Sequence, residues 1–185
     1  NGTYFENVIV NKTVSLIGES RRSTFIDGNS TTKDTVYVLA NYVNISGFTI
    51  KGGDCGICIR SSNACVIRGN IAKNNFCGIN LRDSCSNILT DNIVTSNAEH
   101  GIYLSRSNLN TISNNVIADN NKWSITGGIK ICDSKGNTLA NNTLINNGYN
   151  FGIDGSCLSH FIHDIDSSNT VNEKPIYYWV NRHDK

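Results

Sequence analysis

The sequence predicts an all-β fold, namely a right-handed parallel β-helix with coils of about 22–27 residues and three short strands per coil. The first observation behind this prediction is a repeat. Copies of one motif begin at successive Gly-Ile pairs, at Gly56, Gly78, Gly101, Gly128 and Gly152. The starts lie 22, 23, 27 and 24 residues apart, a period typical of stacked-repeat proteins.

The second observation is the spacing of the apolar residues that open each copy. They come in pairs separated by one residue: Ile57 and Ile59, Ile79 and Leu81, Ile102 and Leu104, Ile129 and Ile131. A period of two indicates a strand with one buried face, whereas a helix needs a period near 3.6. Each Gly-Ile segment is therefore predicted to form the first strand of a coil.

The third observation is that Asn recurs every five residues through the rest of each copy. The matched positions are Asn87, Asn92 and Asn97, then Asn110, Asn115 and Asn120, then Asn137, Asn142 and Asn147, with Cys65, Asn70 and Asn75 in the first copy. Asn suits turns because it tolerates left-handed backbone geometry and its amide bonds to nearby backbone. Coils stacked about 4.8 Å apart would place equivalent amides in contact, so we expect a ladder through Asn70, Asn92, Asn115 and Asn142.

The regular repeats span residues 56–153, and less regular coils precede them over residues 1–55. Apolar pairs such as Val8 with Val10 and Val36 with Val38 continue the pattern upstream. Residues 18–34 are polar and rich in turn-forming residues, apart from the pair Phe25-Ile26. We predict that this stretch is a loop that leaves the stack and rejoins it.

The repeat breaks over residues 154–185, which hold the single proline. One interpretation is a cap that protects the last coil. The other is that Ile176, Tyr178 and Val180 alternate as a strand, and that the solenoid resumes beyond them.

Composition narrows the classes of partner. The net charge of +1 and the pI near 7.7 predict no nucleic-acid surface, and no apolar run approaches the roughly 20 residues of a membrane span. The chain carries 29 Asn. It has no Met and begins without a signal peptide, so we expect a mature or excised piece of a longer precursor.

Several segments carry a resemblance to a known family: NGTYFENVIVNKTVSLIGE, TFIDG, ANYVNISGFTI, the GI-x-I and N-x-I repeats, and SSNTVNEKPIYYWVN. They resemble the NosD-like parallel β-helix repeat proteins, which are common in archaeal cell-surface proteins. These belong to a broader class of carbohydrate-binding and sugar-hydrolase β-helices. The resemblance implies an extracellular or cell-surface location. It also favours resumption of the repeat over a true cap, because repeats in this family usually run on beyond such a tail.

Seven cysteines suggest staples between neighbouring coils. Cys55 and Cys77 precede successive Gly-Ile pairs, and a rung step of about 4.8 Å lies within the Cα range for a disulfide. Cys65 with Cys85, and Cys132 with Cys157, lie near shared corners and are the other candidate pairs. Cys58 is left over, between two inward residues, and we expect it to face outward as a link to another chain or as a free thiol.

A metal site at Cys157, His160 and His163 is the alternative interpretation of the tail. Against it, the chain has no Met to bind Cu(I), and Asp164 and Asp166 suit a turn. We expect no metal and no cofactor.

Sequons for N-glycosylation occur at Asn1, Asn11, Asn29, Asn44 and Asn141. Asn29 lies on the predicted loop and is the best candidate, followed by Asn11 and Asn44. Asn141 lies beside a ladder position and is predicted to be the least accessible.

The acidic residues are scattered along the sequence, and no pair is predicted to share a strand face in adjacent coils beside a basic residue. The catalytic motifs of pectin esterases and polygalacturonases are missing. We therefore expect no catalytic residues.

The predicted function is structural: a subunit of an envelope layer, sheath or filament that self-associates by stacking of coils, whose open edges are templates for assembly. The first alternative is a module that binds cell-surface glycans through Trp123, Tyr103, Arg60 and Arg82. Trp123 also suits a simple wall-covering role, and the two arginines a solvated pair near Asp83. The second alternative is a polysaccharide lyase or epimerase.

Overall fold

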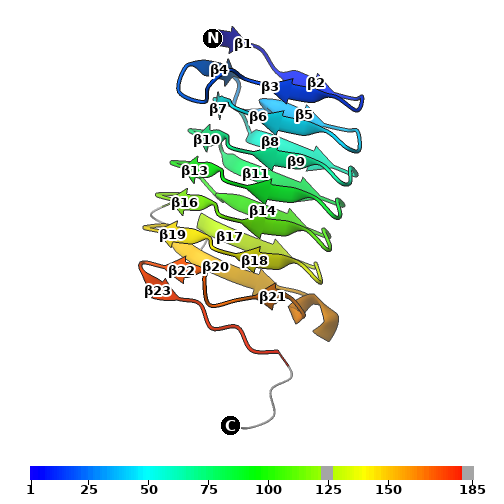
Figure 1. The fold of residues 1–185 in the computed structure, drawn as a ribbon, viewed down its shortest axis with the longest axis vertical. Helices are drawn as coiled ribbons and strands as arrows, with labels where there is room; N and C mark the ends of the chain where they lie inside the picture. The colour runs from blue at the N-terminus through cyan, green and yellow to red at the C-terminus, as the bar shows by residue number, and fades with distance from the viewer. Residues whose placement is uncertain (122–126, 181–185) are drawn as a thin grey trace.

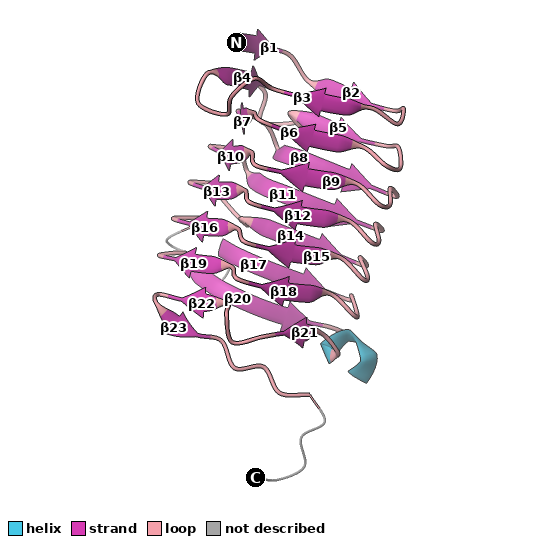
Figure 2. Ribbon diagram, viewed as in Figure 1, coloured by secondary structure: helices cyan, strands magenta, loops and turns pink. Residues whose placement is uncertain are grey.

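The computed structural model describes residues 1–121 and 127–180, which form an elongated stack of β-coils (Figure 1). The N-terminus lies at one end of the stack and the described C-terminal residues lie at the other. Three sheets run along the stack, and their strands pair in parallel except for the last pair, β22 with β23 (Figure 2). The predicted parallel β-helix is therefore confirmed.

Sheet A has nine strands, in the order β1 (Gly2–Phe5), β4 (Thr24–Asp27), β7 (Thr49–Lys51), β10 (Ile71–Lys73), β13 (Ile93–Thr95), β16 (Val116–Ala118), β19 (Thr143–Ile145), β22 (Thr170–Val171) and β23 (Lys174–Pro175). Sheet B has seven, in the order β2 (Val8–Val10), β5 (Val36–Val38), β8 (Cys55–Arg60), β11 (Cys77–Arg82), β14 (Ile102–Ser105), β17 (Gly127–Cys132) and β20 (Tyr149–Asp154). Sheet C also has seven, in the order β3 (Ser15–Ile17), β6 (Asn44–Ser46), β9 (Val66–Arg68), β12 (Ile88–Thr90), β15 (Thr111–Ser113), β18 (Thr138–Ala140) and β21 (Asp164–Ile165).

The core consists of columns of aliphatic side chains, because equivalent residues of successive coils are in register. In sheet B, Ile57 pairs with Ile79, which pairs with Ile102 and then Ile129. Parallel columns carry one apolar residue per coil in sheet C and in sheet A, and the side chains of the central coils are fully buried. Since burial of one such side chain contributes about 1.5–3 kcal/mol, these columns supply most of the driving force for stacking.

Asparagine ladders line the corners between the sheets. The Asn92 backbone N–H and Nδ2 each donate to Asn115 Oδ1 at 3.0 Å, and Nδ2 also donates to the Ile67 carbonyl at 2.8 Å. This ladder runs through Asn70, Asn92, Asn115, Asn142 and Asn169. Two more run through Asn75, Asn97, Asn120 and Asn147, and through Asn87, Asn110 and Asn137. The ladders satisfy backbone groups that the corners would otherwise bury without a partner.

The left-handed residues at these corners differ from those expected. Except at Asn169, the residue before each ladder Asn has the positive φ, as in Asp91 (58°) and Asn114 (56°), whereas Asn92 and Asn115 do not. The ladder amide is thus selected for its hydrogen bonds, and its neighbour makes the turn.

Thr24–Asp27, inside the segment predicted as a loop, forms strand β4 and pairs with both β1 and β7. Its burial alternates, with Thr24 and Ile26 inside. The prediction of a continuous loop over residues 18–34 was therefore wrong at its centre, because a four-residue strand with one core side chain gives little periodic signal.

The far end of the stack is covered. Strands β21 and β22 extend sheets C and A, β23 reverses against β22, and no described residue after β20 extends sheet B. Ile176 and Tyr178 pack against the core, and the Tyr178 hydroxyl donates to the Phe161 carbonyl. Residues 176–180 form no strand, so these side chains cover the last coil instead of continuing the ladder.

Candidate functional site

A cluster of thiols and a carboxylate lies on the outer side of sheet B. The Cys55 and Cys58 sulfurs of β8 and a carboxylate oxygen of Asp34 all lie within 4.8 Å of one another. Cys77, at the start of β11, is the register partner of Cys55, and its thiol donates to the Ile79 carbonyl at 3.9 Å. We call Asp34, Cys55, Cys58 and Cys77 the thiol–carboxylate cluster.

The strand register brings these four residues together from three successive coils. Cys55 pairs with Cys77, and the Cys55 N–H donates to Asp34 Oδ1 at 3.0 Å. Cys58 lies between Tyr37 of the coil before and Asn80 of the coil after. Asn80 Nδ2 donates to Cys55 Sγ at 3.6 Å, so the amide is directed at the cluster.

The cluster is buried although it lies outside the aliphatic core. Cys55, Cys58 and Cys77 are 5%, 7% and 3% exposed, and Tyr37 and Tyr103 pack over them. Cys58 points out of the aliphatic core, as predicted, but the two tyrosines cover this part of the sheet and bury its thiol. The exposed cysteine is Cys157.

Hydrogen bonding and burial shift the acidity of the cluster. Thiol hydrogen bonds from Cys58 and then Cys77 hold the pKa of Cys55 below its usual value, and the same bonds raise the pKa values of the two donors. Burial raises the pKa of Asp34 to about 6. Cys55 is thus the preferred thiolate, with Asn80 as a further donor to its sulfur.

A histidine and a tyrosine flank the cluster one coil further on. The His100 ring stacks on the Tyr103 ring, with centroids 4.9 Å apart. Burial and then the charge of Lys130 lower the pKa of His100 to about 4, so the ring is neutral at pH 7. Its Nδ1 is buried without a hydrogen-bond partner among the residues that the structure describes.

Three carboxylates gather near the cluster, so the acids are less scattered than the sequence suggested. Asp34 and Asp54 line an open cavity of about 240 Å³ together with Tyr37. Burial, then the charges of Cys55 and Asp54, raise the pKa of Glu99. Within residues 1–121 and 127–180, no ion pair to Lys or Arg balances Asp34, Asp54 or Glu99.

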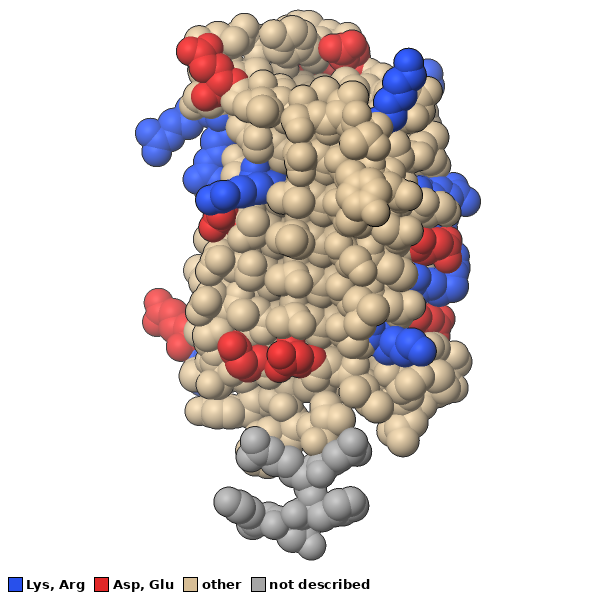
Figure 3. Space-filling model, turned by 45° about the vertical axis from the view of Figure 1, so that its right-hand side comes forward, with Lys and Arg blue, Asp and Glu red and all other residues tan. Residues whose placement is uncertain are grey.

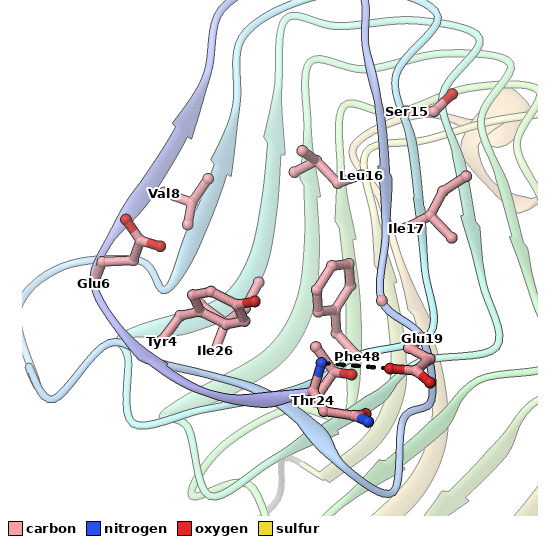
Figure 4. Close-up of a pocket in the computed structure, with 12 residues that line it drawn as sticks. Tyr4, Glu6, Val8, Ser15, Leu16, Ile17, Glu19, Thr24, Ile26 and Phe48 are labelled. Carbon is pink, nitrogen blue, oxygen red and sulfur yellow. Dashed lines mark ion pairs between the residues drawn. The ribbon is translucent and has the colours of Figure 1, made fainter.

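A second notable surface is the uncovered first coil. A cavity of about 430 Å³ opens there, and Figure 4 shows Val8, Leu16 and Phe48 pointing into it. At its rim the N-terminal amine lies 3.6 Å from Glu19, and Ile17 is 74% exposed. Among the described residues, no strand pairs with β1, β2 or β3 on this side.

The seven cysteines are free thiols in the structure, and the register bears differently on the three predicted disulfides. Cys55 and Cys77 are direct register partners, so their disulfide stays a prediction. Cys65 lies at a position that the following coils fill with a ladder Asn, and its backbone N–H donates to Asn87 Oδ1. The backbone N–H of Cys85 donates to Asn63 Oδ1 instead, so Cys65 and Cys85 are not equivalent residues of neighbouring coils. Cys132 and Cys157 are likewise not register partners, because Cys132 pairs with Asp154.

The tail residues considered as a metal site have other partners. His163 Nδ1 accepts the Asn137 N–H at 3.2 Å, and His163 Nε2 bonds to the His160 carbonyl at 3.0 Å. His160 Nδ1 lies 3.2 Å from Asp133, and the Cys157 thiol bonds to Ser159. The tail donors therefore do not converge on one point.

The predicted glycan contacts share one sheet face in part. Arg60 and Arg82 are register partners, both exposed, on the outer face of sheet B. Tyr103 lies on the same face but is half-buried against His100. Trp123 lies outside the described residues.

The side chains of all the sequon asparagines are exposed: Asn1, Asn11, Asn29, Asn44 and Asn141. Asn141, predicted to be the least accessible, makes the corner turn (φ 55°) and is exposed like the other four. Its ranking among them stays a prediction.

The sequence analysis missed the convergence of Asp34, Asn80 and His100 on the cysteines. A signal for the cluster was present: Cys55 and Cys58 lie three residues apart, with Cys77 and Asp34 one coil away on either side.

No helix in the described ranges has the length and apolar character of a membrane span. On the face turned forward in Figure 3, charged side chains lie mostly towards the flanks, and the middle is broadly uncharged.

This three-sheet stack, with its aliphatic columns and amide ladders, defines a parallel β-helix repeat protein. The family model described as "Periplasmic copper-binding protein (NosD)" matches residues 1–177, and the chain belongs to that family.

Two known proteins are similar to the chain. A protein named "Cell surface glycoprotein" from Methanothermus fervidus is 37% identical over 147 residues, which are 80% of this chain and 21% of the relative. The chain thus spans about a fifth of that relative's length. The alginate lyase from Paenibacillus sp. str. FPU-7 superposes with a TM-score of 0.73 over 92% of this chain and 67% of the lyase, at 18% identity. At that identity the likeness shows the fold alone.

Proposed function

We propose that the chain is a structural module of a cell-surface glycoprotein and that the chain of residues 1–185 self-associates through its first coil. The single observation that carries self-association is the exposed edge of that coil. Within residues 1–185 the first coil presents strand edges and the cavity lined by Val8, Leu16 and Phe48, while Tyr178 and Ile176 pack against the core at the other end. The surface location rests on the 37% identity to the cell surface glycoprotein.

The edge of the first coil is chemically suited to pairing with another strand. Val8 N–H and the Val10 carbonyl bond to the second coil, so the N–H and C=O of Ile9 between them point away from it. Proteins usually block such edges with charges, proline or a covering segment. Here the described edge carries exposed apolar side chains, with Ile9 at 63% and Ile17 at 74% exposure.

A second copy of the chain is the proposed occupant of this end. Two first coils can meet around a two-fold axis, whereas stacking of a first coil on a last coil would require displacement of Tyr178. The expected assembly is therefore a closed dimer, and a continuous filament is disfavoured. This refines the layer, sheath or filament that the sequence suggested.

Sedimentation velocity over a range of concentrations tests the proposal. We expect a reversible dimer that Ile9→Pro and Ile17→Lys weaken at least tenfold, about 1.4 kcal/mol. Ile9→Pro removes an N–H on the free side and leaves the bonds to the second coil in place. The matched control is Ile88→Lys, because Ile88 is an exposed isoleucine in the middle of the stack. A wild-type chain that stays monomeric at every concentration contradicts the proposal.

Glycan binding is the second candidate, and the observation that favours it is the exposed register pair of Arg60 and Arg82. Two guanidinium groups one rung apart match successive carboxylates of an acidic polysaccharide. Calorimetry with uronic-acid oligosaccharides tests it: binding that Arg82→Ala abolishes and that Arg68→Ala leaves unchanged would support this function. Absence of heat with the wild-type chain would remove it.

A further inference from the structure

The thiol–carboxylate cluster has the composition of a metal site. Thiolate sulfur and carboxylate oxygen are established ligands of Zn²⁺, which structural sites bind with four ligands in a tetrahedron. The Asp34 oxygen and the sulfurs of Cys55 and Cys58 already lie within 4.8 Å of one another, and Cys77 is the register partner of Cys55 on the next strand. Three donors thus already surround a common centre, and the Cys77 thiol, which donates to the Ile79 carbonyl at 3.9 Å, supplies the fourth once it turns toward Cys55.

The cluster is anchored by the backbone from three coils. Asp34 Oδ1 accepts the Cys55 N–H at 3.0 Å, which holds the carboxyl at the cluster. Cys55 and Cys58 belong to one strand, and Cys77 pairs with Cys55 from the next. Because neighbouring strands fix these positions, the ligand set forms without any rearrangement of the fold.

The electrostatics of the cluster favour a cation. Three thiols are buried beside the half-buried Asp34 carboxyl, and no Lys or Arg among the described residues forms an ion pair with Asp34. Burial of uncompensated negative charge is costly. Asn80 Oδ1, an acceptor beside the Cys55 sulfur, is also buried with no partner in the described chain.

The donor types discriminate between metals. Ca²⁺ and Mg²⁺ prefer oxygen ligands throughout, so three sulfurs exclude them. Thiolate sulfur suits both Cu(I) and Zn²⁺, so the three cysteines alone do not separate these two metals. The carboxylate oxygen of Asp34 does, because Zn²⁺ accepts carboxylate oxygen beside thiolate sulfur whereas Cu(I) prefers sulfur throughout.

We infer that Asp34, Cys55, Cys58 and Cys77 bind one Zn²⁺ ion that staples three successive coils. Binding displaces the thiol protons of Cys55, Cys58 and Cys77 to solvent, with no change of oxidation state. The cavity of about 240 Å³ beside Asp34, Tyr37 and Asp54 gives the ion its path to the cluster. This site replaces the disulfide predicted between Cys55 and Cys77.

Titration of the reduced, metal-free chain with Co²⁺ tests the inference, followed by displacement with Zn²⁺. We expect one equivalent of Co²⁺ to give the sulfur-to-cobalt charge-transfer band and the intense visible bands of a tetrahedral site, both erased by one equivalent of Zn²⁺. Cys58→Ser and Asp34→Asn are expected to weaken binding by more than about tenfold. The control is Cys157→Ser, an exposed cysteine outside the cluster, which should change nothing.

Zinc should also raise the melting temperature of the wild-type chain, so the variants need not be the sole readout. Two results would each overturn the inference: no charge-transfer band with the wild-type chain, or a band that persists unchanged in Cys58→Ser. Peptide mapping of native material gives an independent check. A disulfide between Cys55 and either Cys58 or Cys77 in that material would likewise exclude the zinc site.

Discussion

Replacement of one ladder amide should destabilise the stack far more than replacement of the residue beside it. Asn115 lies in the middle of its ladder and is 1% exposed. Its Nδ2 donates to the Leu89 carbonyl at 2.9 Å and to Asn142 Oδ1 at 3.0 Å. Its Oδ1 accepts from the backbone N–H and the Nδ2 of Asn92, both at 3.0 Å.

Asn115→Ala removes these four side-chain hydrogen bonds and leaves buried groups of the neighbouring coils without partners. At about 1 kcal/mol per bond, with more for each buried group left unsatisfied, the free energy of unfolding should fall by about 3–5 kcal/mol. Asn114 precedes it, is exposed and has a φ of 56°. Asn114→Ala should cost about 1 kcal/mol, because alanine is strained in the left-handed region.

Urea unfolding followed by far-ultraviolet circular dichroism measures both variants against the wild type. The shape of each transition also reports whether the stack loses coils separately, which repeat proteins can do. If Asn115→Ala loses no more stability than Asn114→Ala, the ladder amides contribute nothing beyond their turn, and the reasoning is wrong.

Gly128→Ala should lower the free energy of unfolding by at least about 3 kcal/mol, because the added Cβ would lie 1.9 Å from the Asn150 carbonyl oxygen. Gly69→Ala should lower it by about 1 kcal/mol, because the Cβ there meets open space and only the φ of +65° is unfavourable. Thermal melts of the two variants check this, and equal losses would contradict it. Burial lowers the pKa of His163, so the stabilising contribution of neutral His163 is complete above about pH 6.5 and declines as the pH falls. The loss should reach about 1 kcal/mol, because a protonated Nδ1 can no longer accept the Asn137 N–H. The wild type should therefore lose more melting temperature than His163→Asn between about pH 7.5 and pH 5, and parallel losses would count against this role.

The regular coils could be predicted because each carries the same signal at the same place. Ile57, Ile79, Ile102 and Ile129 alternate with polar residues, and a period of two has one structural interpretation when it recurs every coil. Strand β4 lacked such repetition, and its core contribution is the side chain of Ile26. The covered end was ambiguous because the alternation of Ile176 and Tyr178 suits a strand as well as a packed extended segment.

The candidate site was harder to predict because it depends on register and on what covers the sheet. Cys58 points out of the core as its position implies, but Tyr37 and Tyr103 bury it. Tyr37 comes from the coil before Cys58 and Tyr103 from the second coil after it, so local sequence around Cys58 carries no sign of them. For Cys65 the sequence did carry the relevant signal. Its alignment with Asn87 placed it at a ladder position, where it is not the register partner of Cys85.

Hydrogen exchange at the free edge of the first coil tests the proposed self-association most directly. The backbone N–H of Ile9 points away from the second coil, and it gains a partner when the end is covered by another strand. Residue-resolved exchange at low and high protein concentration should show fast exchange of this amide in the monomer and strong protection in the assembly. Fast exchange of the Ile9 amide at both concentrations would contradict the account.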